Sequence, residues 1–95
     1  MSYFVYILFS EKLRKYYTGQ TQNLSDRIRL HNNGYETFTS KGVPWELFFY
    51  LEVETRSAAI KLEKKIKNFK SQQLIKEFIE NELANGHGSR KIENP

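Results

Sequence analysis

Residues 3–9 form an apolar and aromatic run without a charged side chain. An unbroken run of this kind is typical of a strand that is buried on both faces. Residues 10–15 are polar, and residues 16–21 are rich in side chains that favour strands. The pattern therefore predicts a hairpin of two strands, joined by a loop of several residues.

A helix is predicted directly after this hairpin, over residues 24–33. Asn23 can cap its N-terminus, and Asp26 places a negative charge in its first turn. Gly34 can end the helix in a left-handed conformation. The polar stretch 35–44 contains glycine and proline and predicts a loop.

Residues 45–53 alternate in a way that predicts a third strand. One set of alternate positions is Trp45, Leu47, Phe49, Leu51 and Val53, and the other is Glu46, Phe48, Tyr50 and Glu52. Two helices follow, the first capped by Thr55 or Ser57 and reaching about residue 69, the second capped by Ser71 and reaching about residue 84. The predicted order of elements is β-β-α-β-α-α.

A length of 95 residues suits a single small domain. We expect residues 1–84 to form that domain. Residues 85–95 are polar and aperiodic from His87 onward, so we expect them to be a disordered tail.

Composition narrows the classes of function. The chain has no cysteine and only two histidines. These numbers exclude a disulfide framework or a structural zinc site built from this chain. Carboxylate oxygen would therefore be the main metal ligand. The formal net charge of +4 suits an anionic partner, of which nucleic acid is the commonest.

No stretch approaches the roughly 20 apolar residues that span a bilayer, and no signal peptide is evident. We therefore expect a soluble, cytoplasmic protein that does not bind membranes, and the oligomeric state is left open.

The first predicted helix carries two ionisable side chains on its apolar face. Leu24, Ile28 and Leu30 define that face, and Arg27 and His31 fall inside the same arc. An inward guanidinium needs a carboxylate partner or an opening through which an anion reaches it. Arg27 is therefore half of an internal ion pair or an anion-binding group, and His31 is a hydrogen-bonded core residue or a catalytic one.

The second predicted helix repeats this pattern, because Glu63 lies inside its broad apolar arc. Lys61, Lys64 and Lys65 occupy the other side of the helix. They are either a solvated face or contacts to phosphate groups.

Five polar residues follow one another at defined spacings. Tyr6 lies in the first apolar strand, and Tyr17-Thr18-Gly19 begins eleven residues later. Arg27 follows ten residues after Tyr17, and His31 lies one helical turn after Arg27. Glu63 lies on a later predicted helix. The combination resembles the GIY-YIG nuclease superfamily, in particular small stand-alone proteins related to the nuclease domain of the bacterial excision-repair endonuclease. The resemblance covers about residues 3–80.

The two tyrosine motifs of that superfamily correspond to Phe4-Val5-Tyr6 and Tyr17-Thr18-Gly19. Both tyrosines are kept, while Phe4 replaces a glycine and Thr18 an isoleucine. The excision-repair relatives carry a lysine where this chain has Gln20. Some members also have an asparagine ligand after the glutamate, for which Asn68 and Asn81 are available.

The resemblance implies an α+β fold, in which a small three-stranded antiparallel sheet is flanked by helices. It also implies an endonuclease, a hydrolase that cleaves DNA phosphodiester bonds with one divalent cation, Mg²⁺ or Mn²⁺, in repair or recombination. Such cleavage needs an activated water, charge neutralisation at the phosphoryl oxygens and stabilisation of the departing alkoxide.

The resemblance suggests a catalytic set of Tyr6, Tyr17, Arg27, His31 and Glu63. Glu63 is the expected metal ligand, because Mg²⁺ accepts one or two carboxylates plus waters and substrate oxygens. Arg27 is expected to hold the phosphate by two parallel hydrogen bonds. Tyr17 is the expected base, Tyr6 its hydrogen-bonded neighbour or substitute, and His31 a group that orients a tyrosine hydroxyl or shuttles a proton.

Five further positions complete the expected site. Gly19 is expected at a structural turn or at a close approach of the backbone. The expected nucleic-acid contacts are Gln20, Lys61, Lys64 and Lys65.

Three hypotheses remain open at this point. The first is the metal-dependent endonuclease. The second is a nucleic-acid-binding module of the same fold with little or no turnover. The third is a protein-interaction domain, in which Arg27 and Glu63 would form a closed internal ion pair.

Overall fold

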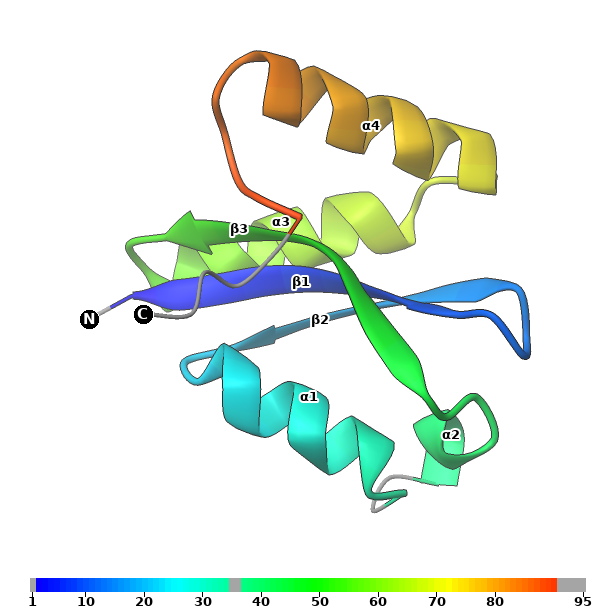
Figure 1. Cartoon of the computed structure of the whole chain (residues 1–95). Helices are drawn as coiled ribbons and strands as arrows, with labels where there is room; N and C mark the ends of the chain where they lie inside the picture. The colour runs from blue at the N-terminus through cyan, green and yellow to red at the C-terminus, as the bar shows by residue number, and fades with distance from the viewer. Residues whose placement is uncertain (1, 35–36, 91–95) are drawn as a thin grey trace.

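A computed structural model of the chain describes residues 2–34 and 37–90 and shows a three-stranded antiparallel sheet flanked by helices (Figure 1). The predicted fold class and the predicted order of the main elements are confirmed. The strands are β1 (Tyr3–Ser10), β2 (Lys15–Thr21) and β3 (Trp45–Val53), and the helices are α1 (Leu24–Asn32), α2 (Thr37–Ser40), α3 (Arg56–Lys67) and α4 (Gln72–Ala84).

The helix caps are those that the sequence predicts. The side chain of Asn23 accepts a hydrogen bond from the N–H of Asp26 at 3.1 Å, and Ser71 accepts one from Leu74 at 3.2 Å. For α3 the structure selects Thr55, whose hydroxyl accepts from the N–H of the residue three positions on at 3.1 Å. These bonds satisfy N–H groups that have no partner within the helix.

The short helix α2 was not predicted. It lies in the stretch 35–44, for which the glycine and proline content favours a loop, and residues 35 and 36 lie outside the described part of the chain. Asn32, at the end of α1, fixes this region to the sheet. Its side chain accepts from the N–H of Trp45 at 2.6 Å and donates to the carbonyl of Trp45 at 3.0 Å.

β1 is the central strand, as its apolar run predicts, and the sheet order is β2-β1-β3. The simple alternation predicted for residues 45–53 is wrong, because the register with β1 shifts between Ile7 and Leu8. Ile7 pairs with Phe49, and Leu8 pairs with Leu47. The extra residue of such a bulge moves the following side chains to the opposite face.

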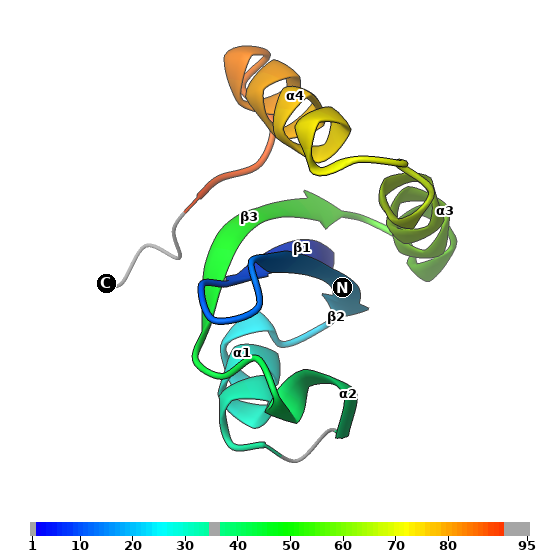
Figure 2. The ribbon, with the colours of Figure 1, turned by 90° about the vertical axis from the view of Figure 1, so that its right-hand side faces the viewer.

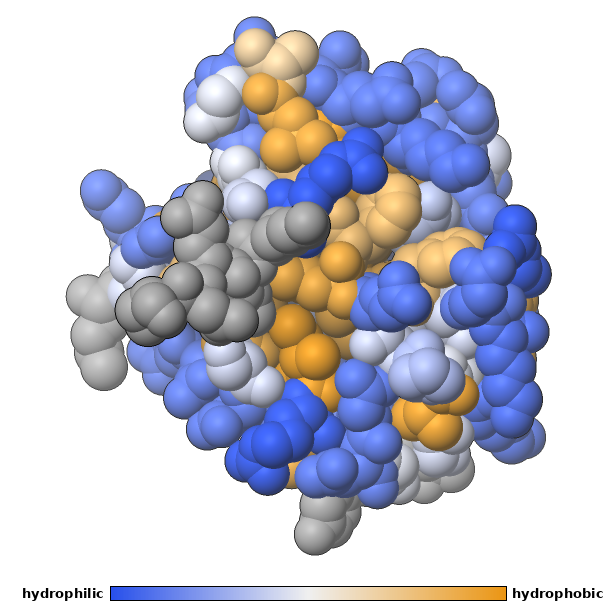
Figure 3. Space-filling model, viewed as in Figure 1, coloured by the Kyte–Doolittle hydropathy of each residue, from blue (hydrophilic) through white to orange (hydrophobic). Residues whose placement is uncertain are grey.

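The sheet lies between two layers of helices, with α1 and α2 on one side and α3 and α4 on the other (Figure 2). Each side has its own buried cluster. The cluster beside α1 contains Tyr6, Leu8, Leu24 and Trp45. The cluster beside α3 and α4 contains Val5, Ile7, Phe49, Ala59, Ile66 and Ile79. Apolar side chains remain visible in the middle of one face of the molecule, surrounded by hydrophilic ones (Figure 3).

The chain returns to the sheet after α4. Tyr50 and Ser89 exchange two backbone hydrogen bonds, of 2.8 and 2.9 Å, and Nδ1 of His87 lies 2.8 Å from a carboxylate oxygen of Glu82. The sequence predicts disorder from residue 85 onward, whereas in the structure backbone pairing and the His87–Glu82 hydrogen bond hold residues 87–89. Residues 91–95 lie outside the described part of the chain. No helix in the described residues is both long and apolar enough to cross a membrane.

Candidate active site

A buried chain of hydrogen bonds joins β1 to α1 and α2. The hydroxyl of Tyr6 lies 2.9 Å from Nε2 of His31, and Nδ1 of His31 lies 3.1 Å from the hydroxyl of Thr39. Tyr6 is 1% exposed, and His31 and Thr39 are fully buried. A neutral imidazole donates at one nitrogen and accepts at the other, so hydroxyl groups, which do both, can satisfy it in either tautomer.

The burial of Tyr6 and His31 limits what they can do. Their side chains face the interior, as the helix pattern predicts for His31, but neither reaches solvent. A group that is sealed from solvent cannot itself meet a substrate in this conformation.

Gly19 lies opposite Tyr6 in the β1–β2 register. The expectation of a structural turn is wrong, because Gly19 is inside strand β2. In that strand, a Cβ atom at Gly19 would lie 2.7 Å from Cζ of Tyr6. Absence of a side chain here leaves room for the Tyr6 ring.

Tyr17 packs beside the rings of Tyr6 and His31 and lies closer to the surface than they do. It belongs to the edge strand β2 and is half-buried. Its ring centroid lies 4.9 Å from that of His31 and 6.5 Å from that of Tyr6. Tyr17 is therefore the member of the predicted tyrosine pair that solvent can reach.

Glu63 is brought toward Tyr17 by α3. Its half-buried carboxylate forms an ion pair with Lys67, with an N–O distance of 2.7 Å. Nζ of Lys67 also lies 6.0 Å from the centroid of the Tyr17 ring, within the range of a cation–π contact. One ammonium group thus links the carboxylate on α3 to the phenol on β2.

The donor groups near Glu63 fit only some metal ions. Among the described residues there is no group of three or more histidine, cysteine, aspartate or glutamate side chains that could hold a metal. A tetrahedral zinc site needs such a group. A hard cation such as Mg²⁺, which keeps most of its waters and takes one or two carboxylates plus phosphate oxygens, fits a single glutamate.

Arg27 lies on α1, four residues before His31, and is half-buried. Residues four apart in a helix share one face, so Arg27 lies on the side of α1 that carries His31 toward the sheet. This agrees with the inward position that the sequence predicts for it.

The predicted nucleic-acid contacts and the two asparagines considered as metal ligands lie on three different elements, β2, α3 and α4, or at their ends. Gln20 is half-buried in β2, next to Gly19. Lys61, Lys64 and Lys65 are exposed on α3, and Nζ of Lys65 lies 5.6 Å from the centroid of the Phe78 ring on α4. Of the asparagines considered as metal ligands, Asn68 caps the end of α3 and Asn81 is exposed on α4.

Two residues of the site were missed by sequence reasoning. Thr39 lies in a stretch that reads as a loop, and nothing in its pattern marks it as a partner of His31. Lys67 could have been found, because a glutamate followed four residues later by a lysine is a common helical ion pair.

Comparison with known proteins defines the class of protein. The model of the GIY-YIG catalytic domain matches residues 2–76. Among solved structures, the solution NMR structure of the UPF0213 protein BH0048 from Bacillus halodurans is similar, with 25% sequence identity, a TM-score of 0.55, and coverage of 84% of each chain. No curated protein matches the chain.

The chain therefore belongs to the GIY-YIG family. Domains of this family are generally nucleases, so the family links the fold to hydrolysis of nucleic acids. The match spans the strands with Tyr6 and Tyr17, helix α1 with Arg27 and His31, and helix α3 with Glu63.

Proposed function

We propose that this protein is a divalent-metal-dependent endonuclease that hydrolyses DNA phosphodiester bonds, acting in the cytoplasm in repair or recombination. The observation that supports the proposal is the convergence of Tyr17 and Glu63, from β2 and α3, on a shared contact with Lys67. Groups distant in sequence meet here at the edge of the sheet. The family match adds the class of reaction.

Glu63 would hold the cation, Mg²⁺ or Mn²⁺, with water molecules and phosphate oxygens as its other ligands. When bound, the cation neutralises charge on the phosphoryl group and stabilises the departing oxygen. Arg27 binds the phosphate by paired hydrogen bonds. Tyr17, the tyrosine that solvent reaches, would act as the base in its phenolate form and would take up the proton of the attacking water as its phenol.

Tyr6 and His31 act as positioning residues in this proposal. The bond between the Tyr6 hydroxyl and His31 fixes the imidazole, and the imidazole ring packs edge-on against Tyr17. A fixed imidazole holds the Tyr17 ring in one orientation. Holding a reacting group in place is itself a large part of catalysis.

A cleavage panel tests this function. The purified chain is incubated with supercoiled plasmid and with linear, nicked, flap and branched DNA, in Mg²⁺, in Mn²⁺ and in excess chelator. We expect cleavage of at least one substrate that requires the metal and is lost in Glu63→Ala. If no substrate is cleaved in any of several divalent metals, the proposed activity is wrong.

The Glu63–Lys67 ion pair also supports a second candidate, a nucleic-acid-binding module without turnover. In the structure the carboxylate expected to hold the metal is neutralised by Lys67. Gln20, where the excision-repair relatives carry lysine, favours the same alternative. Salt-sensitive DNA binding without cleavage, unchanged in Glu63→Ala, would identify such a module.

A further inference from the structure

Two adjoining hollows run along the face of the sheet that carries α3 and α4. The first, of about 280 Å³, reaches Tyr17 and Lys67. The second, of about 230 Å³, reaches Lys15 and Lys70. They share three lining residues, Tyr16, Phe69 and Ile75. We call the two hollows together the β2 groove; between them they reach from Tyr17 of the candidate active site to Lys15 at the hairpin end of the sheet.

The lining of the β2 groove is basic and aromatic. Three lysines line it, Lys15, Lys67 and Lys70, and no carboxylate side chain is among the described residues that line either hollow. Tyr16 and Phe69 are half-buried, so part of each ring is accessible. Cationic side chains beside accessible aromatic rings are the combination that binds single strands of nucleic acid, with phosphates on the cations and bases stacked on the rings.

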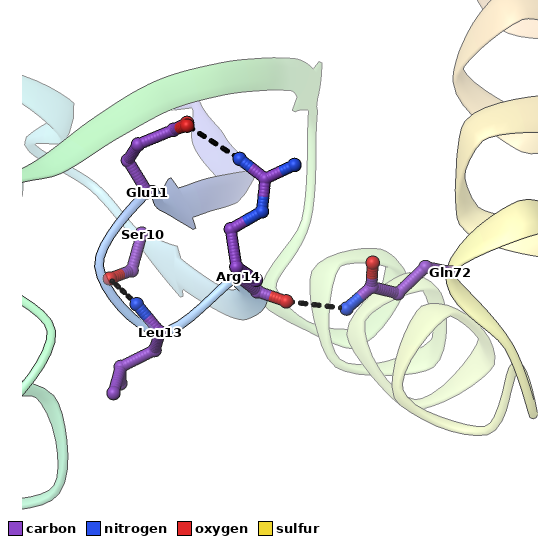
Figure 4. Close-up of polar contacts among 5 residues, drawn as sticks. All are labelled: Ser10, Glu11, Leu13, Arg14 and Gln72. Atoms are coloured by element: carbon purple, nitrogen blue, oxygen red, sulfur yellow. Dashed lines mark hydrogen bonds and ion pairs between the residues drawn. The ribbon is translucent and has the colours of Figure 1, made fainter.

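The walls of the β2 groove are held in place from both sides. The hairpin loop is tied to the start of α4, because Nε2 of Gln72 donates to the carbonyl of Arg14 at 2.8 Å (Figure 4). The ring of Tyr16 packs against the rings of Phe9 and Phe48, with centroid distances of 5.0 and 5.2 Å. A groove that is formed before its ligand arrives loses less entropy on binding.

We propose that the β2 groove binds the unpaired strand of nucleic acid that flanks the linkage placed at Tyr17 and Glu63. The proposal rests on the function proposed above, because the groove opens beside those residues. It goes further in naming the substrate class: nucleic acid in which a single-stranded segment adjoins the cleaved position. The charge of the groove suits a phosphate backbone, and its rings suit bases that have no pairing partner.

Binding in the presence of a chelator tests this inference separately from cleavage. Fluorescence anisotropy compares a blunt duplex DNA with the same duplex carrying a single-stranded extension at either end. We expect the extension at one end to tighten binding about tenfold, a gain typical of stacking one or two bases. Lys15→Glu and Lys70→Glu should each remove most of that gain and lower the dependence of log affinity on log salt by about 0.7 per lost phosphate contact.

The control is Arg56→Glu, which changes the charge by the same amount at an exposed position at the N-terminus of α3, away from the groove. It should retain the gain from the extension. If the extension gives no gain, or if all three variants lose it equally, the groove is not the strand site. Equal competition by poly-glutamate would show general binding of polyanions and would also overturn the proposal. This binding test does not measure cleavage. A protein that shows the groove effect but cleaves no DNA in the panel described above would refute the proposed endonuclease and would leave the groove proposal standing.

Discussion

The hydroxyl of Tyr6 lies 2.9 Å from Nε2 of His31, and both side chains are sealed from solvent. This bond connects the first tyrosine motif of the family to helix α1. Tyr17, by contrast, is half-buried at the sheet edge. In the proposed function, Tyr6 and His31 are positioning residues and Tyr17 is the base.

Replacing Tyr6 by phenylalanine keeps the ring and removes the buried bond. Because Nε2 of His31 then loses its hydroxyl partner, we expect Tyr6→Phe to lower the free energy of unfolding by about 1–3 kcal/mol. For a domain of this size, each kcal/mol corresponds to a shift of about 4–8 °C in Tm. Thermal melting followed by circular dichroism measures it. Tyr3→Phe, at a half-buried tyrosine of the same strand, is the matched control, and equal melting of the two variants would refute a role for the bond.

Adding one methyl group at Gly19 should also destabilise the fold. A Cβ there would press on the Tyr6 ring, which is 1% exposed. Overpacking of this kind costs about 1–3 kcal/mol, so Gly19→Ala should reduce the free energy of unfolding by that amount in a denaturant titration. Gly86→Asn, at a left-handed position with open space around it, should cost less. The reverse order of the two variants would contradict the packing described here.

In the proposed function, the ammonium group of Lys67 competes with the divalent cation for the carboxylate of Glu63. Removing its charge in Lys67→Met frees the carboxylate, and a surface ion pair is worth about 0.2–1 kcal/mol, so Mn²⁺ should bind up to about fivefold more tightly. Electron paramagnetic resonance of free Mn²⁺ measures this without nucleic acid or turnover. Lys64→Met, on the same helix, should leave the affinity unchanged. Weaker Mn²⁺ binding in Lys67→Met would mean that Glu63 is not the metal ligand.

Tyr16 should make the stability of the protein depend on alkaline pH. Burial raises the pKa of Tyr16, and the guanidinium groups of Arg90 and Arg14 offset part of the rise. The folded state therefore keeps the phenolic proton to a higher pH than the unfolded chain does. The stability that the protonated Tyr16 phenol contributes is present in full below the ordinary tyrosine pKa of about 10 and is lost as the pH rises above that value.

The matching measurement compares Tm at about pH 9 and about pH 11 for the wild type and for Tyr16→Phe. The wild type should lose more stability over this interval than the variant, because the variant has no proton to release at that position. Tyr3→Phe controls for the removal of a tyrosine elsewhere. Identical alkaline losses in all three proteins would show that Tyr16 does not carry the effect.

Local signals in the sequence predicted much of the fold. Asn23, Thr55 and Ser71 cap their helices as expected, because a side chain that satisfies free N–H groups is a short-range feature. The inward position of His31 followed from helical periodicity alone. Where a signal lies within one helix or one turn, the sequence was sufficient.

Long-range features could not be predicted in this way. The register shift beside Leu8 depends on how β3 meets β1, and the alternating pattern of β3 does not reveal it. Ser89 pairs with Tyr50, which is far away in the sequence. The composition around Ser89 suggests disorder and does not indicate this pairing. Thr39 became a partner of His31 only through the tertiary packing of α1 and α2.

The most direct measurement of the proposed function is the metal-dependent cleavage rate of Glu63→Gln, on the DNA substrate that the wild type cleaves best. Glutamine keeps the size of the side chain and removes the charge that would hold the cation, so cleavage should fall by at least about a hundredfold, the loss typical of removing one group that stabilises charge in the transition state. Glu80→Gln, at an exposed carboxylate on α4, should cleave at the wild-type rate. Full activity in Glu63→Gln would contradict a metal-dependent nuclease centred on this residue.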